Sequence, residues 1–236
     1  MCSRTDVPAL RNRPSLVAIM RMSKKRQVCV LCGKRSATTQ DHVPPKGIFP
    51  KPRPNDLITV PACFSCNHGA SRQDEIFRVN LSLHAGVDAP DTKALWENHA
   101  LRTVKHNRRL RRKLVSGMRP VYVKSTGGII LRKEGGVLWD SVAHDSVINR
   151  IIRGLYFHHY GSILPPESRI KVNWHRLLTK EMEEESRARG WAHESIAGGH
   201  FQYRYGRSEI NQVQSIWLFQ FYGRHWASGH TNLKSV

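Results

Sequence analysis

The chain has 236 residues, 39% of them hydrophobic, and it carries 38 Lys and Arg against 18 Asp and Glu, a formal net charge of +20. This length and apolar content can build a buried core, which excludes a wholly disordered chain. The positive charge predicts a polyanionic partner, because every neutralised phosphate releases condensed counterions. We expect nucleic acid, with DNA favoured over RNA, rather than an anionic membrane surface.

Residues 1–26 are basic and show no hydrophobic periodicity, which predicts a disordered tail. The apolar stretch at residues 16–20 is too short for a membrane helix and lacks the cleavage site of a signal peptide. We therefore expect a cytoplasmic protein with no membrane partner. Met22, shortly before the first cysteine pair, is an alternative start of the chain.

The cysteines predict a metal site. Four of the five form two C-x-x-C pairs, which are Cys29 with Cys32 and Cys63 with Cys66. In a cytosolic chain this spacing favours metal over disulfides. Gly33 follows the first pair and predicts a knuckle turn whose backbone N–H groups face the thiolates. Four thiolates make a closed tetrahedral site, so we expect a structural zinc; four unrelated buried cysteines are the alternative.

A second group of residues predicts a catalytic site. The dipeptide Asp41-His42 stands between the cysteine pairs, and Asn67 directly follows the last cysteine. Mg²⁺ and Mn²⁺ prefer oxygen ligands, which Asp41 and Asn67 would supply at a strand end and a helix start. A neutral His42 can take a proton from an attacking water as the general base. The alternatives are a hydrogen-bonded Asp-His turn before Pro44, and a helix N-cap role for Asn67.

Residues 92–115 have the apolar periodicity of an amphipathic helix, and its other face is strongly basic. No acidic residue occurs between Ala100 and Lys124, where the basic residues are concentrated, so we expect this stretch to follow nucleic-acid phosphates, with a solvated surface as the alternative. The expected contacts are Arg72, Arg108, Arg109, Arg111, Arg112 and Lys113. The alternative for Arg72 is a solvated charge on a helix surface. His68, four residues earlier, fits a phosphate contact or a solvated position equally well.

The remainder of the chain predicts alternating strands and helices. Residues 121–124, 129–133 and 137–139 are β-formers separated by glycine pairs and predict a small meander. Helices are expected at residues 141–160 and 179–189, and strands at 170–174, 201–205 and 215–222. The last of these strands is apolar enough to be central in a sheet.

Residues 27–80 resemble the HNH (ββα-metal) nuclease family, in the variant with two C-x-x-C pairs and Asn after the last cysteine, as in phage junction-resolving endonucleases. The resemblance rests on the four cysteines, Asp41-His42 and Asn67. It implies a ββα unit, with His42 as general base, Asp41 and Asn67 as ligands of the catalytic metal, and products with 5′-phosphate and 3′-hydroxyl ends.

The chain departs from this family at one position. Many members carry an Asn five residues before the third cysteine, where it braces the loop that bears the catalytic His. Here that position is Ile58, and the nearest candidate is Asn55, three residues earlier. Asn55 can serve if the proline-rich loop at residues 50–54 shifts the register.

We therefore expect an α+β protein in three parts. They are a tail at residues 1–26, a zinc-stapled ββα-metal module at 27–85, and a mixed α/β region at 90–236 that binds substrate or a partner. The expected function is metal-dependent hydrolysis of phosphodiester bonds, and the alternative is a non-catalytic zinc ribbon that binds nucleic acid. The resemblance suggests a phage or bacterial anti-phage origin. The sequence is compatible with nicking or with double-strand cutting, with or without a sequence preference. It is also compatible with a protein partner or a homodimer.

Overall fold

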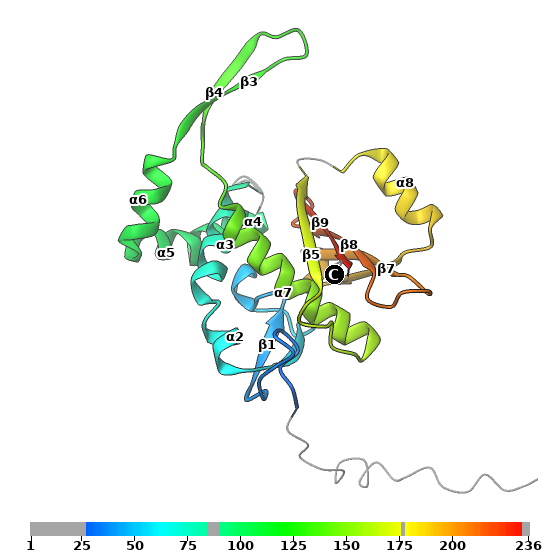
Figure 1. Ribbon diagram of the computed structural model, residues 1–236. Coiled ribbons are helices and arrows are strands. Elements are labelled where there is room, and N and C mark those ends of the chain that lie inside the picture. The colour runs from blue at the N-terminus through cyan, green and yellow to red at the C-terminus, as the bar shows by residue number, and fades with distance from the viewer. Residues whose placement is uncertain (1–26, 85–89, 176–177, 233–236) are drawn as a thin grey trace, which may run out of the picture.

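The computed structural model describes residues 27–84, 90–175 and 178–232 (Figure 1). The described chain mixes helices with a two-stranded sheet β1-β2, a two-stranded sheet β3-β4 and a five-stranded sheet in the order β5-β9-β8-β7-β6. The α+β class expected from the sequence is confirmed. The tail expected at residues 1–26 and the boundary near residue 86 lie outside the described residues. None of the described helices has the length and apolar character to cross a membrane.

The first hairpin pairs β1 (Thr39–Val43) with β2 (Ile58–Ala62) in antiparallel register, with Asp41 opposite Val60 and His42 opposite Thr59. The 3₁₀ turn η1 (Lys46–Ile48) follows β1. The short helix α2 (Phe64–His68) follows β2, and the longer α3 (Ser71–His84) comes next. Side chains alternate along β1, so Asp41 and Val43 are buried while Gln40 is exposed.

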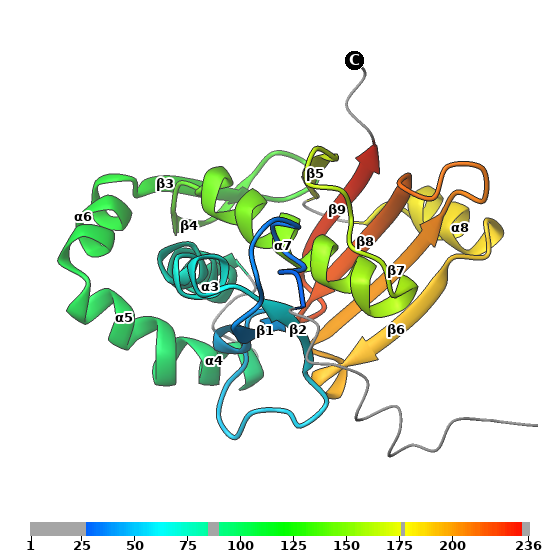
Figure 2. The same cartoon turned by 60° about the horizontal axis from the view of Figure 1, so that its bottom comes forward.

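The helix α7 (Ser141–Tyr160) has the bounds that its sequence predicts. The Asp140 side chain accepts a hydrogen bond from the backbone N–H of Ala143 and begins the helix, and Gly161 ends it in the left-handed conformation. α7 lies between the hairpin, α3 and the large sheet (Figure 2). It packs tightly on β1, because a Cβ at Gly154 would come within 2.5 Å of the Val43 side chain.

The large sheet is antiparallel throughout. Its strands are β5 (Arg169–His175), β6 (Ala192–Ile196), β7 (Phe201–Arg207), β8 (Ser215–Phe221) and β9 (His225–Asn232). The apolar β8 lies between β9 and β7 and is central, as expected. The helix α8 (Lys180–Ala188) and the turn η3 (Ala197–Gly199) stand between strands. One buried cluster runs from Cys29 through α7 to Ala227, so the cysteine-bearing segment and the sheet share a core.

The basic helix expected at residues 92–115 is present but broken. It consists of α4 (Pro90–Leu95), the π-turn η2 (Trp96–Ala100), α5 (Leu101–His106) and α6 (Arg108–Ser116). The break is at Asn107, which leaves helical geometry at φ −89° and ψ 86°, and whose side chain accepts a hydrogen bond from the Leu110 backbone N–H. Asn favours such a capping position over a helix interior, which explains the interruption.

The expected meander is a two-stranded arm of β3 (Arg119–Lys124) and β4 (Ile130–Gly136), which projects from the molecule (Figure 1). The third strand, expected at residues 137–139, is wrong, because this segment has no regular structure. Instead Trp139 stacks on His225, with ring centroids 5.0 Å apart and planes at 29°. Residues 137–139 are therefore attached through the ring of Trp139 rather than through hydrogen bonds to a neighbouring strand.

Candidate metal and catalytic site

The four paired cysteines lie together, with all four sulfur atoms within 4.8 Å of one another. Sulfur atoms in a tetrahedral zinc site at about 2.3 Å from the metal are separated by about 3.8 Å, so the cluster fits such an ion. Cys29 and Cys63 are buried, and Cys32 and Cys66 are half-buried. The predicted metal-binding set is therefore brought together, and it could hold a metal ion.

Local backbone geometry builds this cluster as two knuckles. Gly33 adopts φ +62° and donates its N–H to the Cys29 carbonyl at 2.8 Å, which is the turn that its place after the first pair predicts. The N–H of Val30 donates to the Pro61 carbonyl at 2.9 Å and ties the first knuckle to β2. Burial raises the pKa of the Cys32 thiol, but backbone N–H groups of Arg35 and Lys34 outweigh it and bring the pKa to about 6.

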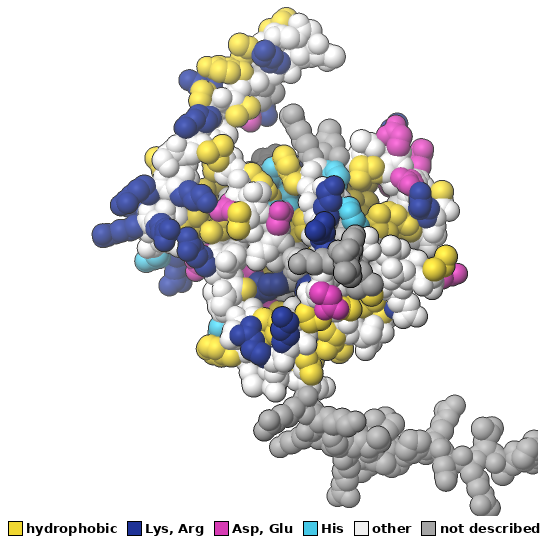
Figure 3. Space-filling view, viewed as in Figure 1, with side chains coloured by type: hydrophobic (Ala, Val, Ile, Leu, Met, Phe, Trp, Pro, Cys, Tyr) yellow, Lys and Arg dark blue, Asp and Glu magenta, His cyan; other side chains and the backbone are white. Residues whose placement is uncertain are grey.

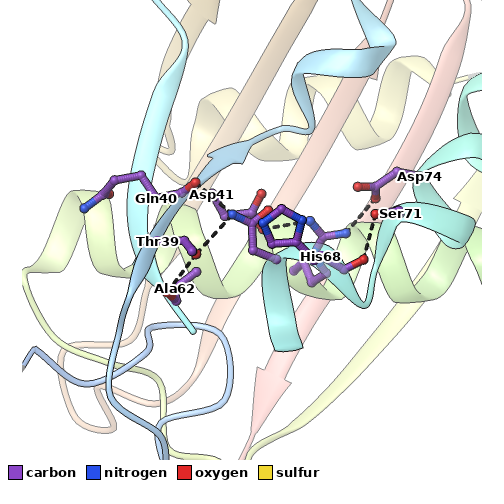
Figure 4. A network of polar contacts seen from close by, with 9 residues as sticks. Thr39, Gln40, Asp41, Ala62, His68, Ser71 and Asp74 are labelled. Carbon is purple, nitrogen blue, oxygen red and sulfur yellow. Dashed lines mark hydrogen bonds and ion pairs between the residues drawn. The ribbon is translucent and has the colours of Figure 1, made fainter. Parts of the chain in front are cut away.

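Asn67 joins the second knuckle to β1. Its side-chain nitrogen donates to the Gln40 carbonyl at 3.0 Å and to the Thr39 hydroxyl at 3.1 Å, and Figure 4 shows these contacts beside Asp41. Both bonds use the nitrogen, so the carbonyl oxygen of Asn67 stays available. The helix start and N-cap expected for this residue are wrong: Asn67 lies in the last turn of α2, and the N-cap position is Cys63.

Asp41 is engaged by a residue that no motif indicates. Its carboxylate accepts a hydrogen bond from Arg150 Nη2 of α7 at 2.7 Å, and Arg150 Nη1 donates to Asp74 of α3 at 2.6 Å (Figure 4). Asp41 is only 6% exposed. Burial alone would lower the pKa of Arg150, but the carboxylates of Asp74 and Asp41 raise it, so the guanidinium stays charged.

His42 is half-buried and faces away from this ion pair, because adjacent residues of a strand point to opposite sides. Burial lowers its pKa, and Lys46 and Arg53 add to the effect while Asp41 opposes it. His42 thus lies on a cationic side of the hairpin. His68, the other histidine nearby, is exposed and stacks on Phe64 at 4.3 Å between ring centroids.

No family model, curated protein or solved structure matches this chain. The function therefore has to be inferred from the residues and their geometry.

The expected nucleic-acid contacts are partly brought together. Arg72 of α3 shares a cleft of about 690 Å³ with Arg109, Arg112 and Lys113 of α6. Arg108 and Arg111 are exposed on α6 but do not line this cleft. Lysine and arginine side chains gather at this end of the molecule in Figure 3. Lys113 also pairs with Asp140 at 2.5 Å, so it has an acidic partner within the chain.

Asn55, the nearest candidate for the middle Asn of the motif, lies in the loop before β2. Asn55 is exposed, and its neighbour Asp56 accepts a hydrogen bond from the Ala197 backbone N–H at 2.9 Å. Ile58 pairs with Val43 as the first residue of β2. The loop is therefore anchored to the C-terminal region through Asp56.

Proposed function

We propose that this protein is a metal-dependent endonuclease of the HNH type, which hydrolyses phosphodiester bonds in nucleic acid and acts on DNA in preference to RNA. One observation carries the proposal: the Asn67 side chain is hydrogen-bonded to β1 beside Asp41-His42, at the hairpin where the four cysteines meet. A residue directly after the last cysteine is thereby fixed against the predicted catalytic dipeptide.

The cysteine cluster would hold a structural zinc. Its four thiolates leave no position for a substrate, so this ion would contribute to folding rather than to chemistry. Bound to both knuckles, zinc would fix the start of β1 and the helix that carries Asn67 in one arrangement.

The catalytic ion would be held by Asp41 and Asn67. Their oxygen donors suit Mg²⁺ or Mn²⁺, and the hydrogen bonds of the Asn67 nitrogen leave its carbonyl oxygen free to ligate. Arg150 bonds one oxygen of Asp41, leaves the other to a metal and fixes the orientation of the carboxylate, as outer hydrogen bonds do for metal ligands. Such an ion supplies charge stabilisation at a phosphate in hydrolysis.

His42 would act as the general base and take the proton of the attacking water. Because Asp41 and His42 face opposite sides of β1, the phosphate would have to lie at the end of this strand to be reached by both. Lys46 and Arg53 place positive charge around His42, and this charge would attract the substrate backbone to that side.

A non-catalytic nucleic-acid-binding zinc ribbon is the second candidate, and one observation favours it. The Asp41 carboxylate is buried and ion-paired with Arg150, which is sufficient to explain its presence without any metal. In that case the basic surfaces would bind DNA or RNA and nothing would be cut.

The experiment that separates the two candidates uses supercoiled plasmid and a structured RNA, each incubated with Mg²⁺, Mn²⁺ or EDTA. Wild type should nick or linearise the plasmid with metal and leave it intact in EDTA, and His42→Ala should not cut. His193→Ala, which alters an exposed histidine of β6, is the matched control and should cut normally. Binding by both proteins with no cutting of either substrate would select the zinc ribbon.

A further inference from the structure

A second cationic cleft is lined by Arg53, one of the cations that lower the pKa of His42. It has a volume of about 950 Å³ and opens between the loop after residue 50, α3, η2 and α5. We name it the Arg78 cleft after one of the residues that line it. Its cationic side chains are Lys51, Arg53, Arg78 and Arg102, and the imidazole rings of His99 and His106 also line it.

The charges of the Arg78 cleft are only partly balanced within the described residues: the carboxylates of Glu75 and Asp74 act on Arg78, but four Lys and Arg residues line the cleft. Glu75 is the one acidic residue among the described residues that line it, and its carboxylate accepts a hydrogen bond from the Asn107 side chain at 3.4 Å. None of the four Lys and Arg residues takes part in an ion pair of the described chain. Arg78 instead donates from Nη2 to the Thr103 hydroxyl at 2.6 Å.

Three buried nitrogen atoms around the Arg78 cleft have no hydrogen-bond partner: Nε of Arg53, Nε of Arg78 and Nε2 of His99. Buried polar groups are nearly always hydrogen-bonded, so several exceptions at one place indicate a binding site. Burial, followed by the charges of Arg78, Arg53 and Lys51, lowers the pKa of His99. An anion in the cleft would relieve this accumulation of positive charge.

The Arg78 cleft is connected to the candidate catalytic histidine by the segment that follows β1. Arg53 lines the cleft, and its charge acts on both His42 and His99. The guanidinium of Arg78 lies against η1, the turn after β1, since a Cβ at Gly47 would come within 3.0 Å of its Nη1. The cleft is therefore bordered by the segment that directly follows the strand of His42.

We propose that the Arg78 cleft binds a backbone phosphate of the nucleic-acid strand on which the candidate site acts. Guanidinium groups match phosphate geometry and keep their charge when buried, which suits Arg53 and Arg78 to this role. The identity of the strand rests on the proposed function, whereas the affinity for phosphate rests on the unbalanced cations and unpaired nitrogens alone.

The test is binding of a fluorescently labelled DNA duplex in EDTA, followed by anisotropy between about 50 and 200 mM salt. The double variant Lys51→Gln/Arg102→Gln changes two exposed residues of the cleft, and Arg169→Gln/Lys171→Gln removes the same charge from β5. We expect the cleft variant to bind about tenfold more weakly, with a slope of log K against log salt reduced by about one unit for each phosphate that it no longer neutralises. The β5 control should bind within about twofold of wild type.

Arg78→Gln probes the buried guanidinium directly and should weaken binding in the same way, with thermal melting as the check on folding. If it fails to fold, the double variant still decides. Equal weakening by the cleft and β5 variants, or none by either, would overturn the proposal. Inorganic phosphate that raises the melting temperature of wild type, with DNA affinity unchanged in the cleft variant, would assign the cleft to free phosphate and also overturn it. Cleft-dependent binding by a wild type that never cuts would support the cleft while refuting the nuclease.

Discussion

Arg150 donates a hydrogen bond from Nη2 to the carboxylate of Asp41 at 2.7 Å, across 109 residues of sequence. The same guanidinium bonds Asp74, so one side chain of α7 connects β1 of the hairpin with α3. The Arg150 and Asp41 side chains are only 13% and 8% exposed. The orientation of Asp41 therefore depends on a helix that lies outside the predicted nuclease module.

Arg150→Ala should destabilise the fold by about 3–5 kcal/mol, because it leaves the buried carboxylate of Asp41 and the partly buried carboxylate of Asp74 without their ion-pair partner. Arg187→Ala removes an exposed i,i+4 pair with Glu183 and should cost less than about 1 kcal/mol. Urea denaturation of both variants measures the difference. Equal free energies of unfolding for the two would show that the Arg150 ion pairs do not hold the three elements together.

Removal of a cysteine ligand should release the metal. Wild type is expected to bind a single zinc, and Cys29→Ser or Cys63→Ser should lose both the zinc and the folded state, because structural zinc contributes folding free energy directly. Cys2→Ser changes the cysteine outside the two pairs and should retain the metal. Elemental analysis with thermal melting measures both properties. A Cys29→Ser protein that keeps its zinc would contradict the assignment.

Asn67→Ala should abolish cutting and also reduce stability by about 1–3 kcal/mol, since it removes two hydrogen bonds to β1 together with the candidate ligand. Thr39→Val removes one of these hydrogen bonds but leaves the Asn67 oxygen in place, so it should cost stability alone. Cutting rates with Mg²⁺ are expected to differ by at least about 100-fold between the two variants. Similar cutting rates for the two variants would contradict a role of Asn67 as a metal ligand and leave it only the structural role of connecting α2 with β1.

Acid should destabilise the protein through a buried histidine. His225 is fully buried, its ring nitrogens lie 3.4 Å from His84 and 3.3 Å from His144, and burial lowers its pKa to about 2. Below the ordinary value of 6.5, the unfolded chain binds a proton at His225 and the folded chain does not. Stability should therefore fall by about 1.4 kcal/mol per pH unit from this group.

This acid dependence is measured as the free energy of unfolding between about pH 7 and pH 5, the range around the ordinary histidine pKa. His225→Gln removes the titrating group and should flatten the dependence, although His144, whose pKa burial also lowers, would leave part of it. His193→Gln, at an exposed position, serves as the control for loss of a histidine. An identical pH dependence in wild type and His225→Gln would contradict the role of His225.

Some elements of this fold can be predicted from the sequence because their signals are local. α7 has an apolar face at helical spacing, an Asp before its first residue and a Gly after its last, so its bounds are predictable. No pattern in the sequence indicates β9. Its buried positions are His225, Ala227, Gly229 and Thr231, small or polar residues that conceal the alternation of a strand.

The candidate site also contains some residues that local sequence signals predict and others that they do not. The cysteine cluster follows from ligand spacing, which is a property of neighbouring residues. Arg150 and Asp74 carry no motif, and only the packing of α7 on the hairpin and α3 brings them to Asp41. The Arg78 cleft likewise combines a loop, two helices and a π-turn, and its residues have no common spacing in the chain.

The most direct test of the proposed nuclease activity is the single-turnover rate at which an end-labelled DNA duplex is cut in Mg²⁺ by wild type and by His42→Ala. Loss of a positioned general base is expected to slow the chemical step by about 10²–10⁴-fold. Wild type should yield 5′-phosphate and 3′-hydroxyl ends. His42→Ala should bind the duplex as tightly as wild type does but cut it about 10²–10⁴-fold more slowly. Equal cutting rates for the two proteins would contradict the assignment of His42 and of the site built around it.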